Sequence, residues 1–297
     1  MYTSANWPDL LEPGLRKVFS DAWWLEQLQA IAPILFNIED SMKAVEHDLE
    51  DGDLLDFAPF SGQVAYDDTG EGYKTNYTHA QFARGMKIER TLVDDDLYRV
   101  ISRRPQKLGL ASFRKRETDA ASVFNNAFNS GFTGGDGQAL GSSAHPSNNG
   151  GPSQSNLGTT SLSPTEVDNA RIKMKGFLTN RGNFQTIQPD LLLVPMALES
   201  YAFEIINSNG KVDTANNNPN FHRGRYKLVV WDNYLTSGTH WYLIDSKLMK
   251  EFLLWFDRIK PEFYKDSEFD TLTAKFAGYM RYSYGWSDWR WLYGENS

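Results

Sequence analysis

The chain has 297 residues, no cysteine, and 38 acidic against 30 basic side chains, which gives a formal net charge of −8. The absence of cysteine excludes disulfides, thiolate metal sites and cysteine nucleophiles. The acidic balance argues against general binding of polyanions, which needs a basic surplus. The sequence contains no apolar run of about 18 residues that would cross a membrane, and no secretory signal is recognisable at its start. We therefore expect a globular protein with more than one domain-like unit.

Residues 1–60 predict an arm with short helices. Apolar side chains recur from Phe19 to Ile31 until Pro33 interrupts the pattern, and the following stretch "EDSMKAVEHDLEDGD" is acidic and polar. No self-contained core is evident in this segment. We therefore expect contacts with other subunits to order it.

Residues 62–93 predict a long β-hairpin, because β-forming residues flank a glycine-containing turn at residues 67–72. Apolar residues are sparse for a hairpin of this length, and such a polar hairpin is marginally stable alone. We expect another subunit to support it.

A helical pattern covers residues 106–130 and places aromatic and small residues on one stripe. The basic run at residues 114–116 falls on the polar side, where a solvated or inter-subunit face is favoured over nucleic-acid binding. The packing residues that we expect along the stripe are Phe113, Phe124 and Phe128.

The stretch that follows, residues 131–160, is rich in glycine and serine and has few apolar residues. Irregular segments longer than about 12–15 residues are uncommon in compact domains and are usually functional or mobile. We interpret this stretch as a connector between the long helix and the next unit.

Residues 160–246 predict an α/β unit. The segment "SPTE" at 163–166 is a capping box that begins a helix, "PDLLLVP" at 189–195 is typical of a strand buried on both faces, and a second helix follows it. The run "RYKLVVWDNYLTSGTHWYLID" predicts a hairpin about Ser237 and Gly238. The β-rich residues 250–297 should pack back on the long helix, which makes the α/β unit an insertion in an α+β fold.

The sequence contains no recognisable phosphate-binding, nucleophile or metal-binding motif. The glycines of the connector match neither the P-loop nor the dinucleotide-binding spacing, and its serines do not form a G-x-S-x-G elbow. None of the five histidines has a partner at a metal-binding spacing. We therefore expect no catalytic residue, no metal and no cofactor.

A carbohydrate-active enzyme is a distant alternative. Its acids would come from residues 94–96 or from the pair at 51 and 53, and its sugar platform would come from Trp286, Trp289 and Trp291. Capping of the following helix is the favoured role for the acids at 94–96, because acids near a helix N-terminus complement its dipole.

The order of these elements, together with particular motifs, resembles the HK97-like major capsid protein of tailed phages. "DGQALGSSAHP" followed by "SNLGTTSLSPTEVDNA" is similar to the D-G-x-x-L…H-P…N-L…L-S pattern of Mu-like and related capsid proteins, and "PDLLLVPMALESYAFEIINS" is similar to the strand and helix that follow there. The sequence departs from the family at Gly141, where related proteins often carry an aromatic residue. This departure implies a looser anchor for the connector.

The resemblance implies a division of the chain into an N-terminal arm (1–60), an E-loop hairpin (61–93), a P-domain with the spine helix (94–133 and 247–297) and an A-domain (134–246). It implies that the E-loop reaches a neighbouring subunit through Tyr73, Lys74 and Tyr77. The connector motif would be structural, and its residues are Asp136, Gly137, Leu140, His145, Pro146 and Asn156. The family sometimes cross-links a lysine to an asparagine, but Lys74 is more simply a solvated charge.

The function that the resemblance implies is that of a major head protein. It would self-assemble as hexamers and pentamers into an icosahedral virion shell in the host cytoplasm, with portal and scaffold proteins as partners and decoration proteins as possible ones. The shell would enclose double-stranded DNA without sequence-specific binding and without contact to a membrane. An encapsulin-like cellular compartment, which shares the fold, is the closer alternative.

Overall fold

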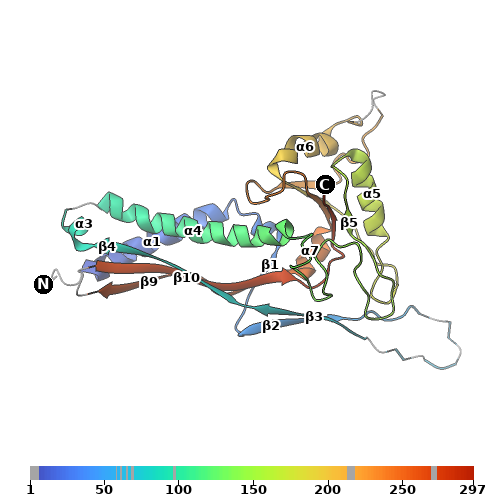
Figure 1. Cartoon of the computed structure of the whole chain (residues 1–297), viewed down its shortest axis with the longest axis horizontal. Coiled ribbons are helices and arrows are strands. Elements are labelled where there is room, and N and C mark those ends of the chain that lie inside the picture. The colour runs from blue at the N-terminus through green and yellow to red at the C-terminus, as the bar shows by residue number, and fades with distance from the viewer. Residues whose placement is uncertain are drawn as a thin grey trace.

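The computed structural model describes residues 7–57, 59–60, 62–64, 66–67, 70–95, 98–212, 218–268 and 273–297. Figure 1 shows long helices and strands running side by side toward the N-terminal end, a second unit standing at the opposite end, and a two-stranded ribbon along the lower edge. The two units are formed around separate sheets.

The long unit is formed on a four-stranded sheet in the order β1–β9–β10–β4. Strands β9 and β10 pair in antiparallel fashion, β4 pairs antiparallel with β10, and β1 runs parallel to β9. This confirms that the C-terminal segment is β-rich. The strands are β1 (Asn37–Asp40), β4 (Ala80–Glu89), β9 (Leu253–Glu268) and β10 (Thr273–Trp286).

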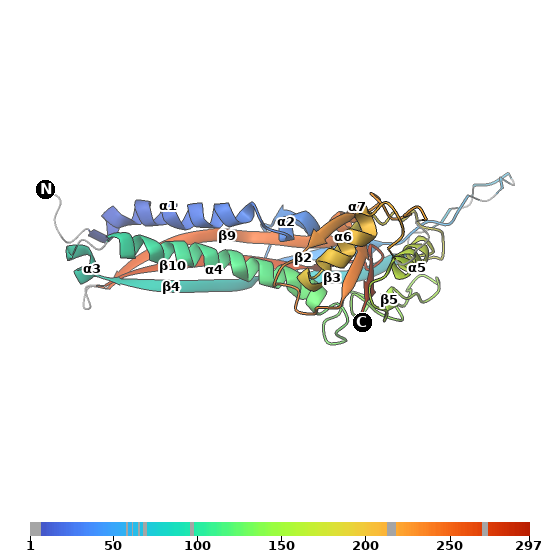
Figure 2. The ribbon, with the colours of Figure 1, turned by 90° about the horizontal axis from the view of Figure 1, so that it is seen from above.

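Two long helices, α1 (Trp7–Gln27) and α4 (Tyr98–Asn125), cover one face of this sheet (Figures 1 and 2). They approach closely at Gly109, where an added Cβ would lie 2.6 Å from the carbonyl oxygen of Phe19. Leu15, Phe19 and Leu108 belong to the apolar cluster between the helices and the sheet. A glycine at the crossing therefore allows both helices to reach the same core.

Two predictions about these helices need correction. The arm contains one 21-residue helix, α1, because Pro13 does not interrupt it and its apolar face packs on α4 within the same subunit. The long helix spans 98–125 instead of 106–130, with Pro105 buried inside it. A proline removes one helical hydrogen bond, and packing against the sheet and α1 outweighs that loss.

The second unit contains a five-stranded sheet in the order β5–β11–β8–β6–β7. The strand predicted at 189–195 is confirmed as β6, which is buried along its whole length. The predicted helix start is also confirmed, since Ser163 Oγ accepts from the Glu166 N–H and Pro164 follows it, while Glu166 Oε1 accepts from Asn169. The elements are β5 (Leu157–Gly158), α5 (Pro164–Lys175), β6 (Leu191–Val194), η2 (Met196–Leu198), α6 (Glu199–Asn207), β7 (Lys227–Val230), β8 (Trp241–Ile244) and β11 (Leu292–Glu295).

Strand pairing in this sheet differs from the sequence prediction. The hairpin predicted about Ser237 and Gly238 is wrong, because β6 lies between β7 and β8 and pairs with both. The last strand, β11, joins β8 and β5 and does not stay with the long unit. The fully apolar β6 is best buried at an interior position, which displaces the two strands from each other.

The ribbon is formed by β2 (Val45–Asp51) and β3 (Glu71–Thr78). The hairpin predicted for residues 62–93 is therefore wrong in its pairing, since β3 pairs with β2 and β4 pairs with β10. We call β2, β3 and the described residues between them the hairpin, and the described residues of the range 52–70 its tip. The remaining short helices are α2 (Ala32–Leu35), α3 (Arg90–Asp94) and α7 (Ser246–Phe252).

Helix α4 connects the two units through buried charges. The guanidinium of Arg116 forms a bidentate pair with Asp257 on β9, with N–O distances of 2.6 and 3.0 Å. Glu117, which is 2% exposed, accepts from the backbone N–H of Ala32 and from Trp231 Nε1 at 2.9 Å. Burial raises the pKa of Glu117. These contacts fix the helix against the sheet on one side and the second unit on the other.

Candidate assembly surfaces

The connector is anchored by a buried network centred on His145. Its Nδ1 lies 2.6 Å from Asp136 Oδ2, and its Nε2 lies 3.0 Å from Asn156 Oδ1. Asn156 Nδ2 donates to the carbonyls of Leu140 and Leu292, which orients the amide so that Oδ1 faces the imidazole. The ends of the glycine-rich stretch are therefore held locally and tied to β11.

Other residues of the predicted connector motif support this network. Leu140 is fully buried, and Gly137 has a φ of 75°, a conformation that favours glycine. The His145 ring stacks on Trp289 with ring centroids 4.2 Å apart. The carbonyl of Pro146 accepts a hydrogen bond from the Tyr73 hydroxyl at 3.3 Å. The motif thus acts in local packing and also contacts the hairpin.

The expectation of a loose anchor at Gly141 is wrong. The Gly141 N–H donates to the carbonyl of Ala127 at 2.7 Å, and a Cβ at this position would lie 2.5 Å from the Phe128 ring. Phe128 itself stacks on Tyr242. The aromatic ring at this place comes from residue 128, so residue 141 must be small.

Replacing Gly141 by alanine should lower the free energy of unfolding by about 1–3 kcal/mol, because the added methyl group overpacks against Phe128. Urea unfolding followed by tryptophan fluorescence measures the change. Gly14→Ala is the matched control: its Cβ meets nothing within 4 Å, and alanine favours the helix by about 1 kcal/mol. Equal stability of the two variants would contradict the role assigned to Gly141.

A buried polar cluster holds the base of the hairpin against the second unit. Glu50 on β2 accepts from Asn180 Nδ2 at 2.6 Å and lies 3.4 Å from Arg290 Nη1, which also pairs with Asp288 at 2.8 Å. Burial raises the pKa of Glu50, and the Asp288 charge adds to this, while Arg290 opposes it. The hairpin therefore leaves the molecule from a fixed base.

The turn at residues 180–183 also holds the hairpin farther along. Arg181 pairs with Asp67, and Asn183 Nδ2 donates to Asp53 Oδ2 at 2.9 Å and to the Leu54 carbonyl at 2.8 Å. The role of this turn could not be predicted, because the sequence "NRGN" is equally typical of a solvated turn and of a turn bonded to a distant strand. The turn and the cluster around Glu50 together set the direction of the hairpin.

The three residues predicted to contact a neighbour lie in different environments. Tyr77 is buried in its own subunit against Phe256, with ring centroids 5.1 Å apart, so the prediction is wrong for this residue. Tyr73 is half-buried beside the connector, and Lys74 is exposed. The side chains of a β-strand alternate between faces, which places 73 and 77 on the inner face of the hairpin.

The hairpin carries exposed apolar side chains, most of which precede residue 62 and so lie outside the segment 62–93 that was predicted to be poor in apolar residues. Monomeric proteins rarely expose large contiguous apolar patches, and such patches mark interaction sites. A second exposed group lies at the C-terminal end of α1, where Trp24 and Leu25 belong to the last turn and Leu28 follows it. The exposed apolar residues on the hairpin are Leu49, Leu54, Leu55, Phe57, Phe60, Val64 and Tyr66.

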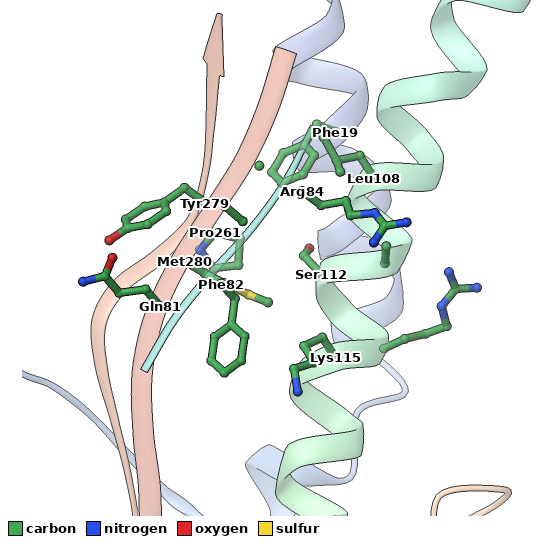
Figure 3. A pocket seen from close by; sticks show the side chains of 14 residues that line it. Phe19, Gln81, Phe82, Arg84, Leu108, Ser112, Lys115, Pro261, Tyr279 and Met280 are labelled. Carbon is green, nitrogen blue, oxygen red and sulfur yellow. The ribbon is translucent and has the colours of Figure 1, made fainter. Parts of the chain in front are cut away.

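A cleft of about 550 Å³ lies between α4 and the strands β4 and β10 (Figure 3). Its walls include apolar side chains such as Phe82 and Met280 and the cations Arg84, Arg114 and Lys115. Lys115 is paired with Asp119 at 2.7 Å. No acid or histidine lines this cleft within the described residues. The cleft thus combines apolar walls with positive charge.

The described residues do not support a sugar site. Trp286, Trp289 and Trp291 are all buried and cannot present a platform to a ligand. Asp94 lies at the end of α3, before α4, and pairs with Arg90 at 3.3 Å, while Asp96 lies outside the described residues.

Among the residues that the structure describes, no group of three histidine, aspartate or glutamate side chains is placed to hold a metal. No helix in the described ranges combines the length and the apolar character needed to cross a bilayer.

The fold is similar to that of several solved phage capsids. The capsid of bacteriophage JBD30 matches with a TM-score of 0.60 and 14% identity over 70% of this chain and 91% of that one. The mature capsid of bacteriophage PhiM1 matches at 0.57 and 9%, covering 90% and 86%. The capsid of cyanophage P-SCSP1u matches at 0.56 and 11%, covering 89% and 86%. At such low identities the similarity concerns the fold.

Sequence comparison supplies the family. A search of curated proteins found no match. One family model, described as phage capsid protein, matches residues 72–294, a span that includes nearly all of β3, the long helix, the connector and most strands of both sheets, but not β1. The resemblance first carried by the connector motif is thus confirmed by an independent match over most of the chain. The chain belongs to the phage capsid protein family.

Proposed function

We propose that this chain is the major head subunit of a tailed bacteriophage and that it assembles as hexamers and pentamers into an icosahedral shell around double-stranded DNA. The observation that carries the proposal is the hairpin, which has a fixed, polar base and an apolar, exposed tip. A subunit that exposes such a tip gains stability when a second copy covers it.

The cleft beside α4 on a neighbouring copy matches the tip in charge and in apolar character. The tip segment "DLLD" at 53–56 places two leucines between two acids, and the exposed Phe57 follows directly. The cleft pairs an apolar interior with Arg84 and Arg114, which are exposed and have no carboxylate partner among the described residues. We assign this cleft as the docking place of the neighbour's tip.

The remaining segments have supporting roles in this proposal. Helix α4 is the spine, the five-stranded unit is the A-domain, and the connector motif joins them. No residue is assigned a catalytic role. The net charge of −8 suits a container from which packaged DNA must leave, because a strongly basic wall would retain the genome. Scaffold and portal proteins would direct assembly in the host cytoplasm before the shell becomes part of the virion.

Expression of the full chain with the phage scaffold tests the proposal. Negative-stain microscopy should show closed shells of uniform size. A protein that stays monomeric under all assembly conditions would refute the proposal. Shells that enclose a protein cargo, identified by native mass spectrometry, and that never package DNA with a portal would favour the encapsulin-like compartment.

A further inference from the structure

A small cationic cleft lies on the second unit and shares no lining residue with the cleft of Figure 3. Its volume is about 180 Å³. Two of its cations come from α5, and the third precedes β7. The lining residues are Arg171, Lys175, Gln188, Pro189, Arg225 and Tyr226. No carboxylate lines the cleft within the described residues.

The three cations are held near one another without being fully neutralised. Arg171 pairs with Asp168 at 2.8 Å, and neither Lys175 nor Arg225 has a carboxylate partner in the described part of the chain. The guanidiniums of Arg171 and Arg225 both lie against the Phe221 ring, at 5.0 and 3.8 Å from its centroid. Because only Arg171 of the three is paired with a carboxylate among the described residues, the cleft keeps an excess of positive charge.

Tyr226 adds an independent observation. The residue is 6% exposed, and its buried hydroxyl has no hydrogen-bond partner among the described residues. Its ring stacks on His222, whose Nε2 contacts the Pro164 carbonyl at 2.9 Å. Burial raises the pKa of Tyr226, so the hydroxyl keeps its proton. Buried polar groups are nearly always hydrogen-bonded, and this hydroxyl is a donor without an acceptor.

We infer that this cleft binds a small oxyanion, held by Arg225, Lys175 and the Tyr226 hydroxyl with Arg171 beside them. Two sources have this chemistry: a free phosphate ion and a carboxylate from a neighbouring copy. An anion would supply the acceptor that Tyr226 lacks, and charge-assisted hydrogen bonds from arginine favour such ligands. All the lining residues belong to one subunit, so binding of a free anion does not depend on the proposed shell.

Calorimetric titration of the unassembled full-length chain with inorganic phosphate tests the inference, with chloride used to keep the ionic strength constant. Wild type should bind phosphate and gain thermal stability. Arg225→Gln and Tyr226→Phe should each weaken binding about tenfold, the loss expected for one hydrogen bond to a charged group. Arg223→Gln, an exposed arginine outside the cleft, is the matched control and should bind as wild type.

Tyr226→Phe also separates a ligand site from a structural role. Without phosphate it should unfold at the wild-type temperature or above, because it removes only an unpaired hydroxyl. No phosphate response in wild type, or an equal response in wild type and both variants, would overturn the inference. Repeating the titration on assembled shells identifies the source: retained binding indicates a free anion, and loss of binding indicates a neighbour's carboxylate in the cleft.

Discussion

Replacing Arg116 by methionine is expected to lower the free energy of unfolding by about 3–5 kcal/mol, the cost of leaving one partner of a buried ion pair alone. Arg116 and Asp257 have side chains only 8% and 3% exposed. The guanidinium also lies 4.8 Å from the ring centroid of Trp255, whose Nε1 donates to Asp257. Without Arg116, the Asp257 carboxylate would stay buried with one weak donor.

Chemical denaturation followed by circular dichroism measures this change. Arg114→Met is the matched control, because Arg114 is exposed on the same helix and surface substitutions usually stay within about 0.5 kcal/mol. Adding Asp257→Asn to Arg116→Met should recover part of the loss by removing the buried charge. If Arg116→Met and Arg114→Met are equally stable, the ion pair does not hold α4 to β9.

Serine at the four tip positions Leu54, Leu55, Phe57 and Phe60 should abolish shell assembly and leave the subunit folded. These side chains are exposed in the single chain, so their loss costs the monomer little. Burial of each leucine or phenylalanine at a subunit contact is worth about 1.5–3 kcal/mol, and a closed shell repeats that contact at every neighbour.

Sedimentation of the variant with scaffold should show only small oligomers, and its circular dichroism and unfolding midpoint should match wild type. Gln63→Ser, a polar change on the same tip, is the control and should assemble normally. Normal shells from the four-serine variant would show that the tip does not join subunits.

Local features of this fold could be predicted from the sequence, whereas strand partners could not. The N-cap at Ser163, the buried strand at 191–194 and the long helix each depend on residues close in the chain, and all three were found. The pairing of β4 with β10 joins residues such as Ala80 and Tyr282. An alternating pattern fixes which face a residue takes but carries no information about the partner strand.

The candidate surfaces show the same division. The motif from Asp136 to Asn156 was recognised because its residues lie close in sequence. The hydrogen bonds of His145 to Asp136 and Asn156 likewise join residues within this stretch. The turn at 180–183 holds a hairpin more than a hundred positions earlier, with Arg181 bonded to Asp67. Tyr77 was wrongly predicted to contact a neighbouring subunit. It is buried by Phe256, a residue far away in the sequence, and the polar sequence around Tyr77 does not indicate this contact.

A cryo-electron microscopy map of the particle formed by the full chain and its scaffold tests the central claim most directly. The proposal predicts an icosahedral shell in which the tip of each hairpin lies on the cleft beside α4 of the adjacent subunit, with Phe57 covered. A protein that forms no closed particle, or a shell in which the tips remain in solvent, would contradict it.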